Sequence, residues 1–252
     1  MASPSTIAAF AIEGERAPRE KSITRVLTID IGGSNIKIMA SGETEPRKRR
    51  SGKRLTPVKM VEIVQQLVEE WSYEAVSIGY PGLVGSQGPS SEPGNLGAGW
   101  VGFDFSSAFG RPVRIMNDAA MQALGSYEGG RMLFLGLGTG LGSALITEEI
   151  ILNLELGHLP YKRGVTLGEA LGRQGLKRLG KDEWRRVVTS MAPALMKAFL
   201  ADSVVLGGGN AKKLKELPHG VRLGHNLTAF RGGFRLWNIG DAQNLLVDNR
   251  QD

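Results

Sequence analysis

The chain has 252 residues, 41% of them hydrophobic and 22% charged, which is enough for one large domain or for two lobes with cores of their own. It contains no cysteine, so disulfide bonds and thiolate metal sites are excluded, and no apolar run approaches the roughly 20 residues of a membrane span. The net charge of +6 favours polyanionic partners. Residues 1–20 lack the charged start and apolar block of a signal peptide. Together with the absence of cysteine, this predicts a cytoplasmic protein without a membrane partner.

The first half of the chain begins with a β-hairpin. Val26–Asp30 and Ile36–Ala40 are apolar β-type runs that a Gly-Gly turn joins. Later elements follow from apolar spacing, from the helix start at Thr56-Pro57 and from glycine- and proline-rich breaks. They are a helix over 57–71, a strand over 75–79, a loop over 80–99, a strand over 113–116 and a helix over 119–127.

The second half repeats this organisation. A hairpin over 132–146 precedes helices over 167–180 and 182–200, a strand over 203–206, a helix over 210–216 and a helix near 226–232. Strands mix with helices throughout, so the fold class is α/β, and two hairpin-first halves indicate a duplicated fold with a central cleft. We expect an N-terminal lobe over 24–115 and a C-terminal lobe over 116–240, between flexible tails at 1–23 and 241–252.

Both hairpins close through glycine-rich turns, at 32–34 and at 138–140. Glycine lets backbone N–H groups approach a ligand without interference from Cβ. Clusters of such N–H groups bind anions, phosphate above all. Two turns of this kind, with Asp30 beside the first, indicate hairpins that bind one phosphate chain and its metal ion. A tight hairpin without a ligand is the alternative for the second turn.

The positive charge concentrates in residues 47–54, where six of the eight residues are lysine or arginine. One interpretation is a solvated hairpin or loop. The other is a binding strip for a polyphosphate donor. Aromatic residues do not interleave with these cations, so nucleic-acid binding by base stacking is not expected.

Five glycine- and acid-containing motifs follow one another along the chain. They are Asp30-x-Gly32-Gly33-x-x-x-Lys37, Asn117-Asp118-Ala119, Gly136-x-Gly138-Thr139-Gly140-x-Gly142, Glu155-x-Gly157-His158 and Val205-Leu-Gly-Gly-Gly209. This set resembles the ROK sugar kinases of the actin, hexokinase and heat-shock-chaperone superfamily, and among them most the polyphosphate glucokinases. The resemblance covers about residues 24–240. It implies an actin/hexokinase-like (ribonuclease H-like) duplicated two-lobe fold with an active-site cleft, Mg²⁺ as cofactor and a homodimer.

Asp118 is the candidate catalytic base. Phosphoryl transfer to a hydroxyl needs an acceptor for the hydroxyl proton, and a carboxylate at the end of the strand over 113–116 can supply it. The resemblance implies that Asp118 also binds a sugar hydroxyl and that Asn117 binds a neighbouring one. As an alternative, Asp118 caps the helix that follows.

Metal and phosphate ligands are expected in the two hairpins. Asp30 is assigned to Mg²⁺, mostly through water, because this ion takes few protein ligands; an Asp that bonds its own turn is the alternative. Lys37 is either a phosphate ligand or a surface lysine. The phosphate-binding candidates are Gly32, Gly33, Ser34, Lys37, Gly138, Thr139 and Gly140.

Glu155 and His158 are the candidate sugar ligands of the second half. A carboxylate and an imidazole can bind several hydroxyls of one ring, and such a site rejects an analogue that lacks one of them. In many ROK proteins the corresponding His binds a zinc held by a cysteine cluster, which is missing here. Asn95 is a further sugar candidate, and Trp100 belongs either to that loop's binding surface or to the core.

Gly207, Gly208 and Gly209 are assigned by the resemblance to the nucleotide, with a plain strand-to-helix turn as the alternative. The chain is thus predicted to be a hexose kinase that transfers a phosphoryl group from polyphosphate, ATP or both to the 6-hydroxyl of glucose. The alternatives are an ATP-dependent kinase of another sugar, such as an N-acetylhexosamine or fructose, and a non-catalytic sugar-sensing regulator. Too few residues precede Val26 for the helix-turn-helix of such regulators, and no nucleic-acid partner is expected.

Overall fold

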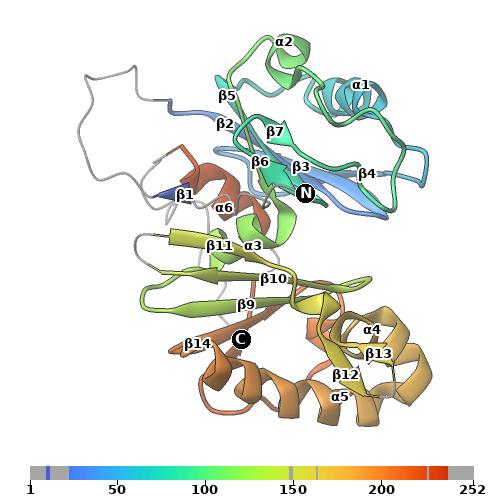
Figure 1. The fold of residues 1–252 in the computed structure, drawn as a ribbon. Coiled ribbons are helices and arrows are strands. Elements are labelled where there is room, and N and C mark those ends of the chain that lie inside the picture. The colour runs from blue at the N-terminus through green and yellow to red at the C-terminus, as the bar shows by residue number, and fades with distance from the viewer. Residues whose placement is uncertain (1–9, 12–22, 148–149, 163, 226, 238–252) are drawn as a thin grey trace, which may run out of the picture. The chain divides into compact units, whose positions relative to one another are not determined.

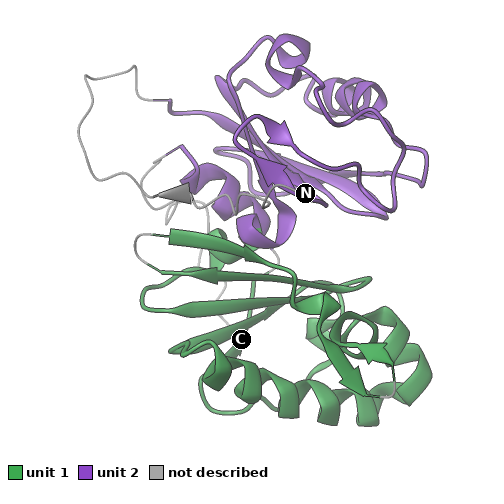
Figure 2. Cartoon of the chain, in the orientation of Figure 1, with its two compact units in different colours: residues 1–14, 122–226 green, residues 15–121, 227–252 purple. Residues whose placement is uncertain are grey.

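The computed structural model describes residues 10–11, 23–147, 150–162, 164–225 and 227–237 (Figure 1). The chain divides into two compact units (Figure 2), here called unit 1 (residues 1–14 and 122–226) and unit 2 (residues 15–121 and 227–252). Both units are α/β. Apart from residues 10–11 and 23, the predicted tails lie outside the described residues, and residues 10–11 form a short strand rather than a free tail.

Unit 2 is built on one five-stranded sheet. Its strand order is β4 (Arg47–Arg50), β3 (Asn35–Ala40), β2 (Val26–Ile31), β5 (Ala75–Tyr80) and β8 (Val113–Asn117). β2, β3 and β4 are antiparallel, whereas β2, β5 and β8 run parallel. The predicted hairpin and both later strands are confirmed, and residues 47–50 of the basic segment form an edge strand.

One face of this sheet is covered by α1 (Pro57–Leu67) and the short α2 (Phe105–Phe109). α1 begins as predicted, with the Thr56 hydroxyl accepting a hydrogen bond from the Lys59 N–H (3.3 Å) and proline at the first helical position. It ends at Leu67, four residues before the expected end. The turn hairpin β6 (Val84–Gly85) and β7 (Gly88–Pro89) lies within the predicted loop.

The opposite face is covered by α6 (Thr228–Arg235), the helix expected near 226–232. The Ser77 hydroxyl on β5 donates to the Gly233 carbonyl (2.6 Å) and accepts from the Trp237 indole N–H (2.9 Å). The Arg114 guanidinium stacks on the Trp237 ring, 4.3 Å from its centroid. This helix therefore joins the sheet of the N-terminal half, although we expected it in a lobe over 116–240. The division also falls inside α3 (Asp118–Ser126), between 121 and 122.

Gly233 lets α6 approach the sheet closely. A Cβ at this position would lie 2.3 Å from both Cγ2 and Oγ1 of Thr28, whose side chain is fully buried. We expect Gly233→Ala to lower the free energy of unfolding by about 1–3 kcal/mol, because a methyl group must fit into a filled space. Thermal or urea unfolding measures this, and adding Thr28→Ala should recover part of the loss. Equal losses in the single and double variants would contradict the contact.

Unit 1 repeats the topology of unit 2. Its sheet has the order β1 (Phe10–Ala11), β11 (Ile150–Leu154), β10 (Leu141–Ile146), β9 (Met132–Leu137), β14 (Ser203–Gly207) and β15 (Val221–Leu223). β9, β10 and β11 are antiparallel, and β14 and β15 extend the sheet in parallel from β9. The order from β11 to β15 matches the order from β4 to β8, which is the duplication expected from the sequence.

The helices of unit 1 are α4 (Leu167–Leu171) and α5 (Arg173–Ala198). Thr166 and Glu169 form a capping box at the start of α4. The break expected between two long helices is confirmed at Gly180, where φ is +75° inside α5. Trp184 of α5 is fully buried in the core of unit 1, and its indole N–H donates to the Leu171 carbonyl (2.9 Å).

The smaller elements of unit 1 are η1 (Leu156–His158), β12 (Pro160–Lys162), β13 (Val165–Thr166) and η2 (Ala211–Lys213). The prediction of a helix over 210–216 was wrong, because the structure has only the 3₁₀ turn η2 there. Among the described residues, none of the helices combines the length and apolar character that crossing a bilayer requires.

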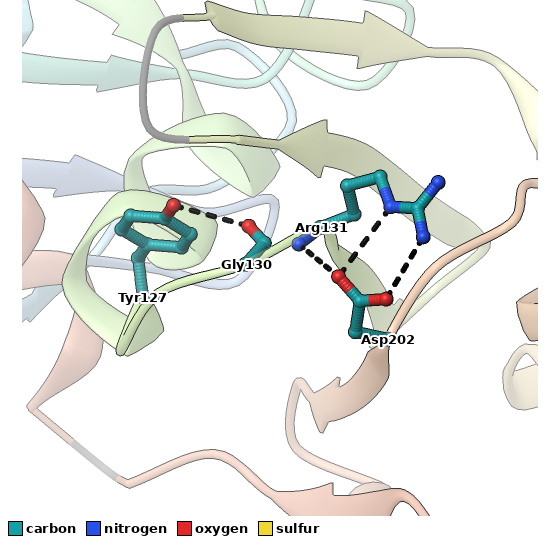
Figure 3. A network of polar contacts seen from close by, with 4 residues as sticks. All are labelled: Tyr127, Gly130, Arg131 and Asp202. Carbon is teal, nitrogen blue, oxygen red and sulfur yellow. Dashed lines mark hydrogen bonds and ion pairs between the residues drawn. The ribbon is translucent and has the colours of Figure 1, made fainter.

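An exposed ion pair joins the starts of β9 and β14 (Figure 3). Asp202 accepts from the Arg131 backbone N–H (2.8 Å) and from its guanidinium (3.0 and 3.4 Å), and the Tyr127 hydroxyl donates to the Gly130 carbonyl (3.0 Å). The side-chain hydrogen bond from Arg131 is the largest cause that lowers the pKa of the Asp202 carboxyl.

This lowered pKa gives a pH dependence with a definite sign. Because the folded pKa of Asp202 lies below its unfolded value, the stabilisation is present above the unfolded pKa and is lost as the pH falls through the folded pKa. Asp202→Asn should lower the Tm slightly at neutral pH, and the difference from wild type should vanish in acid. A Tm difference that stays constant across a pH series would contradict this origin.

Candidate functional site

The carboxyl ends of the parallel strands β2, β5 and β8 lie side by side in unit 2. In register, Asp30 on β2 faces Gly79 on β5, and Gly79 faces Met116 on β8, two residues before Asp118. A Cβ on Gly79 would lie 3.6 Å from the Asp118 Cα, so only a glycine-sized residue separates the two acidic strand ends. This edge of a parallel sheet is where ligands bind in open α/β folds.

Asp118 and Asn117 divide the capping of α3 between them. The Asn117 side-chain oxygen accepts from the N–H groups of Ala119 (3.0 Å) and Ala120 (3.2 Å), and its amide donates to the Gly82 carbonyl (3.1 Å). Asn117 therefore acts as the helix cap and holds the Pro81-Gly82 turn. Its predicted sugar contact gains no support from these bonds. The half-buried Asp118 carboxylate accepts from the Ala119 N–H (2.8 Å) through Oδ1.

Asp30 is buried, with 8% of its surface exposed, and its Oδ2 forms an ion pair with the Nζ of Lys37 on β3 (3.3 Å). Lys37 is thus not a detached surface lysine. Magnesium prefers one or two carboxylates together with water and phosphate oxygens. In the part of the chain that the structure describes, no three His, Cys, Asp or Glu residues cluster as metal ligands. The donor set therefore fits a magnesium ion held by Asp30, water and phosphate, and does not fit an all-protein cage.

The first glycine turn is braced from two neighbouring segments. Ser51, directly after β4, donates through its hydroxyl to the Gly32 carbonyl (2.9 Å) and through its N–H to the Ser34 carbonyl (3.2 Å). The Gly32 N–H donates to the Asn35 carbonyl (3.0 Å) and so closes the turn, while the assignment of Gly32 to phosphate binding stays a prediction. Among the described residues, the N–H groups of Gly33 and Ser34 have no backbone acceptor, so these two remain available to an anion.

Asn95 lies against this turn. A Cβ built on Gly33 would be 2.3 Å from the Asn95 Nδ2, so the amide sits over the glycine. Its loop is tied to the segment after β4, because the Gly97 N–H donates to the Leu55 carbonyl (2.9 Å). Trp100 belongs to the core: it is fully buried, and its indole N–H donates to the Gly97 carbonyl (2.7 Å).

The second glycine turn, in unit 1, is also braced. The Gly138 carbonyl accepts from the Arg173 N–H at the start of α5 (3.0 Å) and from the Asn210 side-chain amide (3.1 Å). The Gly138 N–H donates inside the hairpin to the carbonyls of Gly136 and Gly140 (3.0 and 3.2 Å), and its assignment to phosphate binding stays a prediction. Within the described residues, the N–H groups of Thr139 and Gly140 have no backbone acceptor, and both residues are exposed.

Glu155 directly precedes η1 in unit 1 and His158 ends it, with the Glu155 Oε2 3.9 Å from the His158 Nδ1 and both side chains exposed. The buried Ser143 fixes the start of this turn, since its hydroxyl donates to the Leu154 carbonyl (2.7 Å) and accepts from the Leu156 N–H (3.2 Å). Gly157 packs directly on α4: a Cβ on Gly168 would lie 3.0 Å from the Gly157 carbonyl.

The three glycines at the end of β14, Gly207 to Gly209, have different surroundings. A Cβ on Gly207 would lie 2.4 Å from the Phe134 ring, and one on Gly208, whose φ is +80°, would lie 2.8 Å from the Leu137 backbone. Packing against β9 therefore accounts for these two. Gly209 has open space around it, so of the three it has the room that a ligand needs.

Sequence reasoning missed the bracing residues Ser51, Ser143, Arg173 and Asn210. None belongs to a periodic pattern, and each acts through a bond to a backbone carbonyl far along the chain. Only Asn210, directly after three glycines and a strand, carried a positional signal in the sequence.

Comparison with known proteins agrees with this architecture. The ROK family profile matches residues 26–167, more than half of the chain. No curated protein sequence gives a significant match. Among solved structures, the inorganic polyphosphate/ATP-glucomannokinase from Arthrobacter sp. strain KM is 25% identical, with a TM-score of 0.72 over 85% of this chain and 98% of that one.

Two further structures share the fold. The ROK hexokinase from Thermus thermophilus is 20% identical, with a TM-score of 0.63 over 86% of this chain and 100% of its own. A ROK transcriptional regulator, a homologue of the E. coli MLC protein, is 15% identical, with a TM-score of 0.64 over 84% of this chain and 77% of its own. The α/β fold is of the actin/hexokinase-like class, and the chain belongs to the ROK family.

Proposed function

We propose that the protein is a hexose kinase that transfers a phosphoryl group from polyphosphate, ATP or both to the 6-hydroxyl of glucose. The observation that carries this proposal lies within unit 2: the carboxylates of Asp30 and Asp118 and the glycine turn at 32–34 stand at one edge of one sheet. Membership of the ROK family supports a sugar acceptor. The similarity to a polyphosphate/ATP-glucomannokinase supports both donors.

Asp118 is the proposed general base. The sugar hydroxyl oxygen bonds to the terminal phosphorus while the bond from that phosphorus to its bridging oxygen breaks, and the hydroxyl proton passes to the Asp118 carboxylate. The bond from the Ala119 N–H to Oδ1 (2.8 Å) helps to hold this carboxylate at the start of α3. Because such transition states are loose, orienting the hydroxyl contributes as much as removing its proton.

The remaining contacts with the sugar are assigned to three side chains. Asn95, Glu155 and His158 are proposed to bind the other sugar hydroxyls, since amide, carboxylate and imidazole groups together donate and accept. Asn117 is proposed to position the Asp118 strand end through its cap and its bond to Gly82 rather than to reach the sugar.

The donor phosphates are assigned to the available N–H groups. Gly33, Ser34, Thr139 and Gly140 are proposed to donate to phosphoryl oxygens, and Lys37 supplies a positive charge beside Asp30. Magnesium, when bound through Asp30 and the phosphates, neutralises charge on the transferring group. Gly209 is proposed as the part of the 207–209 segment that approaches a nucleotide.

A matrix of donors and sugars tests the proposal with purified protein. Long-chain polyphosphate and ATP are each combined, with Mg²⁺, with glucose, mannose, N-acetylglucosamine, N-acetylmannosamine and fructose. Glucose phosphorylation with either donor is the expected result. Turnover of only another sugar would favour the alternative ATP-dependent kinase. Sugar binding without any turnover would favour the alternative of a non-catalytic sugar-sensing regulator; a ROK transcriptional regulator shares the fold.

A cytoplasmic location belongs to the same proposal, because the enzyme must share a compartment with its phosphoryl donors. A homodimer is proposed as well, because ROK relatives commonly form dimers. Light scattering during gel filtration measures the oligomeric state. A mass of twice 27.1 kDa is expected.

A further inference from the structure

The edge strand β4 carries cations on both faces of the unit 2 sheet, and the two faces differ. Antiparallel partners that are directly opposite point to the same side. Lys48 is opposite Lys37, and Lys37 is opposite Asp30, so these three form one cross-strand row. Arg50 is opposite Asn35 in the next row on that same face, one step nearer the glycine turn.

The other face of β4 has a structural use. Arg47, opposite Ile38, donates to the Leu67 carbonyl at the end of α1 (2.6 Å) and stacks on the Trp71 ring, 4.2 Å from its centroid. Arg49, opposite Ile36, lies on this α1 side as well. Arg47 is therefore part of the packing, whereas Lys48 and Arg50 lie on the side that carries Asp30.

Lys48 and Arg50 are exposed, and the structure gives them no ion pair with any residue in the described ranges. Like charges directly opposite in a sheet, as in Lys37 and Lys48, destabilise it. The backbone fixes their place relative to the anion turn, because Ser51, the residue after Arg50, bonds the carbonyls of both Gly32 and Ser34. From Asp30 to Lys48 this row crosses two strand spacings, or about 10 Å.

We infer that Lys48 and Arg50 form a subsite for the phosphates of an extended polyanionic donor, beyond the phosphoryl group that is transferred at the glycine turn. The inference deepens the proposed function and rests on it. A linear polyphosphate carries negative charge along its whole length. In ATP, only the three phosphates are charged, and the adenosine that follows them is neutral. The subsite therefore favours inorganic polyphosphate, and more strongly as the chain lengthens.

Arg50→Gln and Arg49→Gln form a matched pair, since they remove the same charge from adjacent exposed residues on opposite faces. Arg50→Gln and Lys48→Gln should each raise the KM for long-chain polyphosphate by about two- to fivefold at low salt. The salt dependence of that KM should also become less steep. Arg49→Gln should match wild type. The KM values for ATP and for glucose should stay unchanged in all three variants.

Equal effects of Arg49→Gln and Arg50→Gln would overturn the subsite. Such a result would leave the cations only the general role of keeping an edge strand from pairing with another chain. A KM for tripolyphosphate that rises as much as the KM for long chains would also overturn it.

Direct binding separates this inference from the proposed function. If wild type transfers phosphate from no donor, the proposed function fails, but fluorescence anisotropy with labelled long-chain polyphosphate still measures the subsite. Weaker binding by Arg50→Gln than by Arg49→Gln supports it. Equal competition by double-stranded DNA of the same charge, with the same sensitivity to Arg50, would assign the surface to nucleic acid instead.

Discussion

Asp118→Asn should lower kcat for phosphoryl transfer by about 10²–10⁴-fold, the usual contribution of a positioned general base. The fold should stay intact, because the asparagine oxygen can still accept the bond that the Ala119 N–H donates to Oδ1 (2.8 Å). Sugar binding, measured by calorimetry without a donor, should weaken far less than turnover. The reason is that an amide can replace one hydroxyl contact but cannot take up the proton.

Asp104→Asn is the matched control for this variant. Asp104 caps α2 by accepting from the N–H (2.9 Å) and hydroxyl (2.6 Å) of Ser107, and these bonds lower the pKa of its carboxyl. This substitution should reduce stability slightly and leave kcat unchanged. Wild-type turnover by Asp118→Asn would remove Asp118 from the mechanism.

Gly172→Ala should reduce both stability and turnover through the second glycine turn. A Cβ on Gly172 would lie 2.6 Å from the Gly168 carbonyl oxygen and 2.7 Å from the Thr139 carbonyl oxygen. These are backbone atoms that cannot rotate aside, so the turn at 138–140 must shift. We expect a loss of about 1–3 kcal/mol in the free energy of unfolding. A shift of about 1 Å in the phosphate-binding groups can lower kcat by about 10²-fold.

Gly85→Ala provides the comparison for this glycine. The nearest heavy atoms to its added Cβ lie 3.8 and 4.0 Å away, so unfolding and turnover should both match wild type. Full turnover by Gly172→Ala, in spite of a lowered Tm, would show that the position of Thr139 does not matter to catalysis.

The sequence predicted the elements whose signal is local. The two hairpins follow from apolar β-type runs that meet at glycines, and α1 follows from its threonine cap and first-turn proline. The sequence of Arg47–Arg50 has no apolar alternation, so residues 47–54 are interpreted from sequence alone as a solvated hairpin or loop, or as a binding strip for polyphosphate. Its strand conformation depends on pairing with β3 and on the contact of Arg47 with α1, which lie outside the segment.

The same limit applies to α6. Its helical pattern was visible, but its docking on β2 and β5 depends on the close contact of Gly233 with Thr28, a residue far away in sequence. Chain order alone therefore predicts that α6 belongs to a C-terminal lobe that ends near residue 240. Its contact with β2 places it in unit 2 instead.

At the candidate site, residue types could be predicted from the sequence, but the directions in which their polar groups point could not. Gly32 and Gly138 lie in the expected turns, yet their N–H groups donate to carbonyls that close those turns. Asn117 stands beside Asp118 as expected, yet it is the residue that caps α3. Whether a polar group faces inward or outward is set by backbone geometry, which composition and spacing do not contain.

Under the proposed function, this chain should move a phosphoryl group onto the 6-hydroxyl of a hexose. Proton-coupled ³¹P NMR of wild-type protein with glucose, Mg²⁺ and either donor tests it directly. We expect a new phosphate monoester signal that is split by the two protons on C6, with no signal for an ester at another carbon. Donor that stays intact, or that yields inorganic phosphate alone, would contradict it.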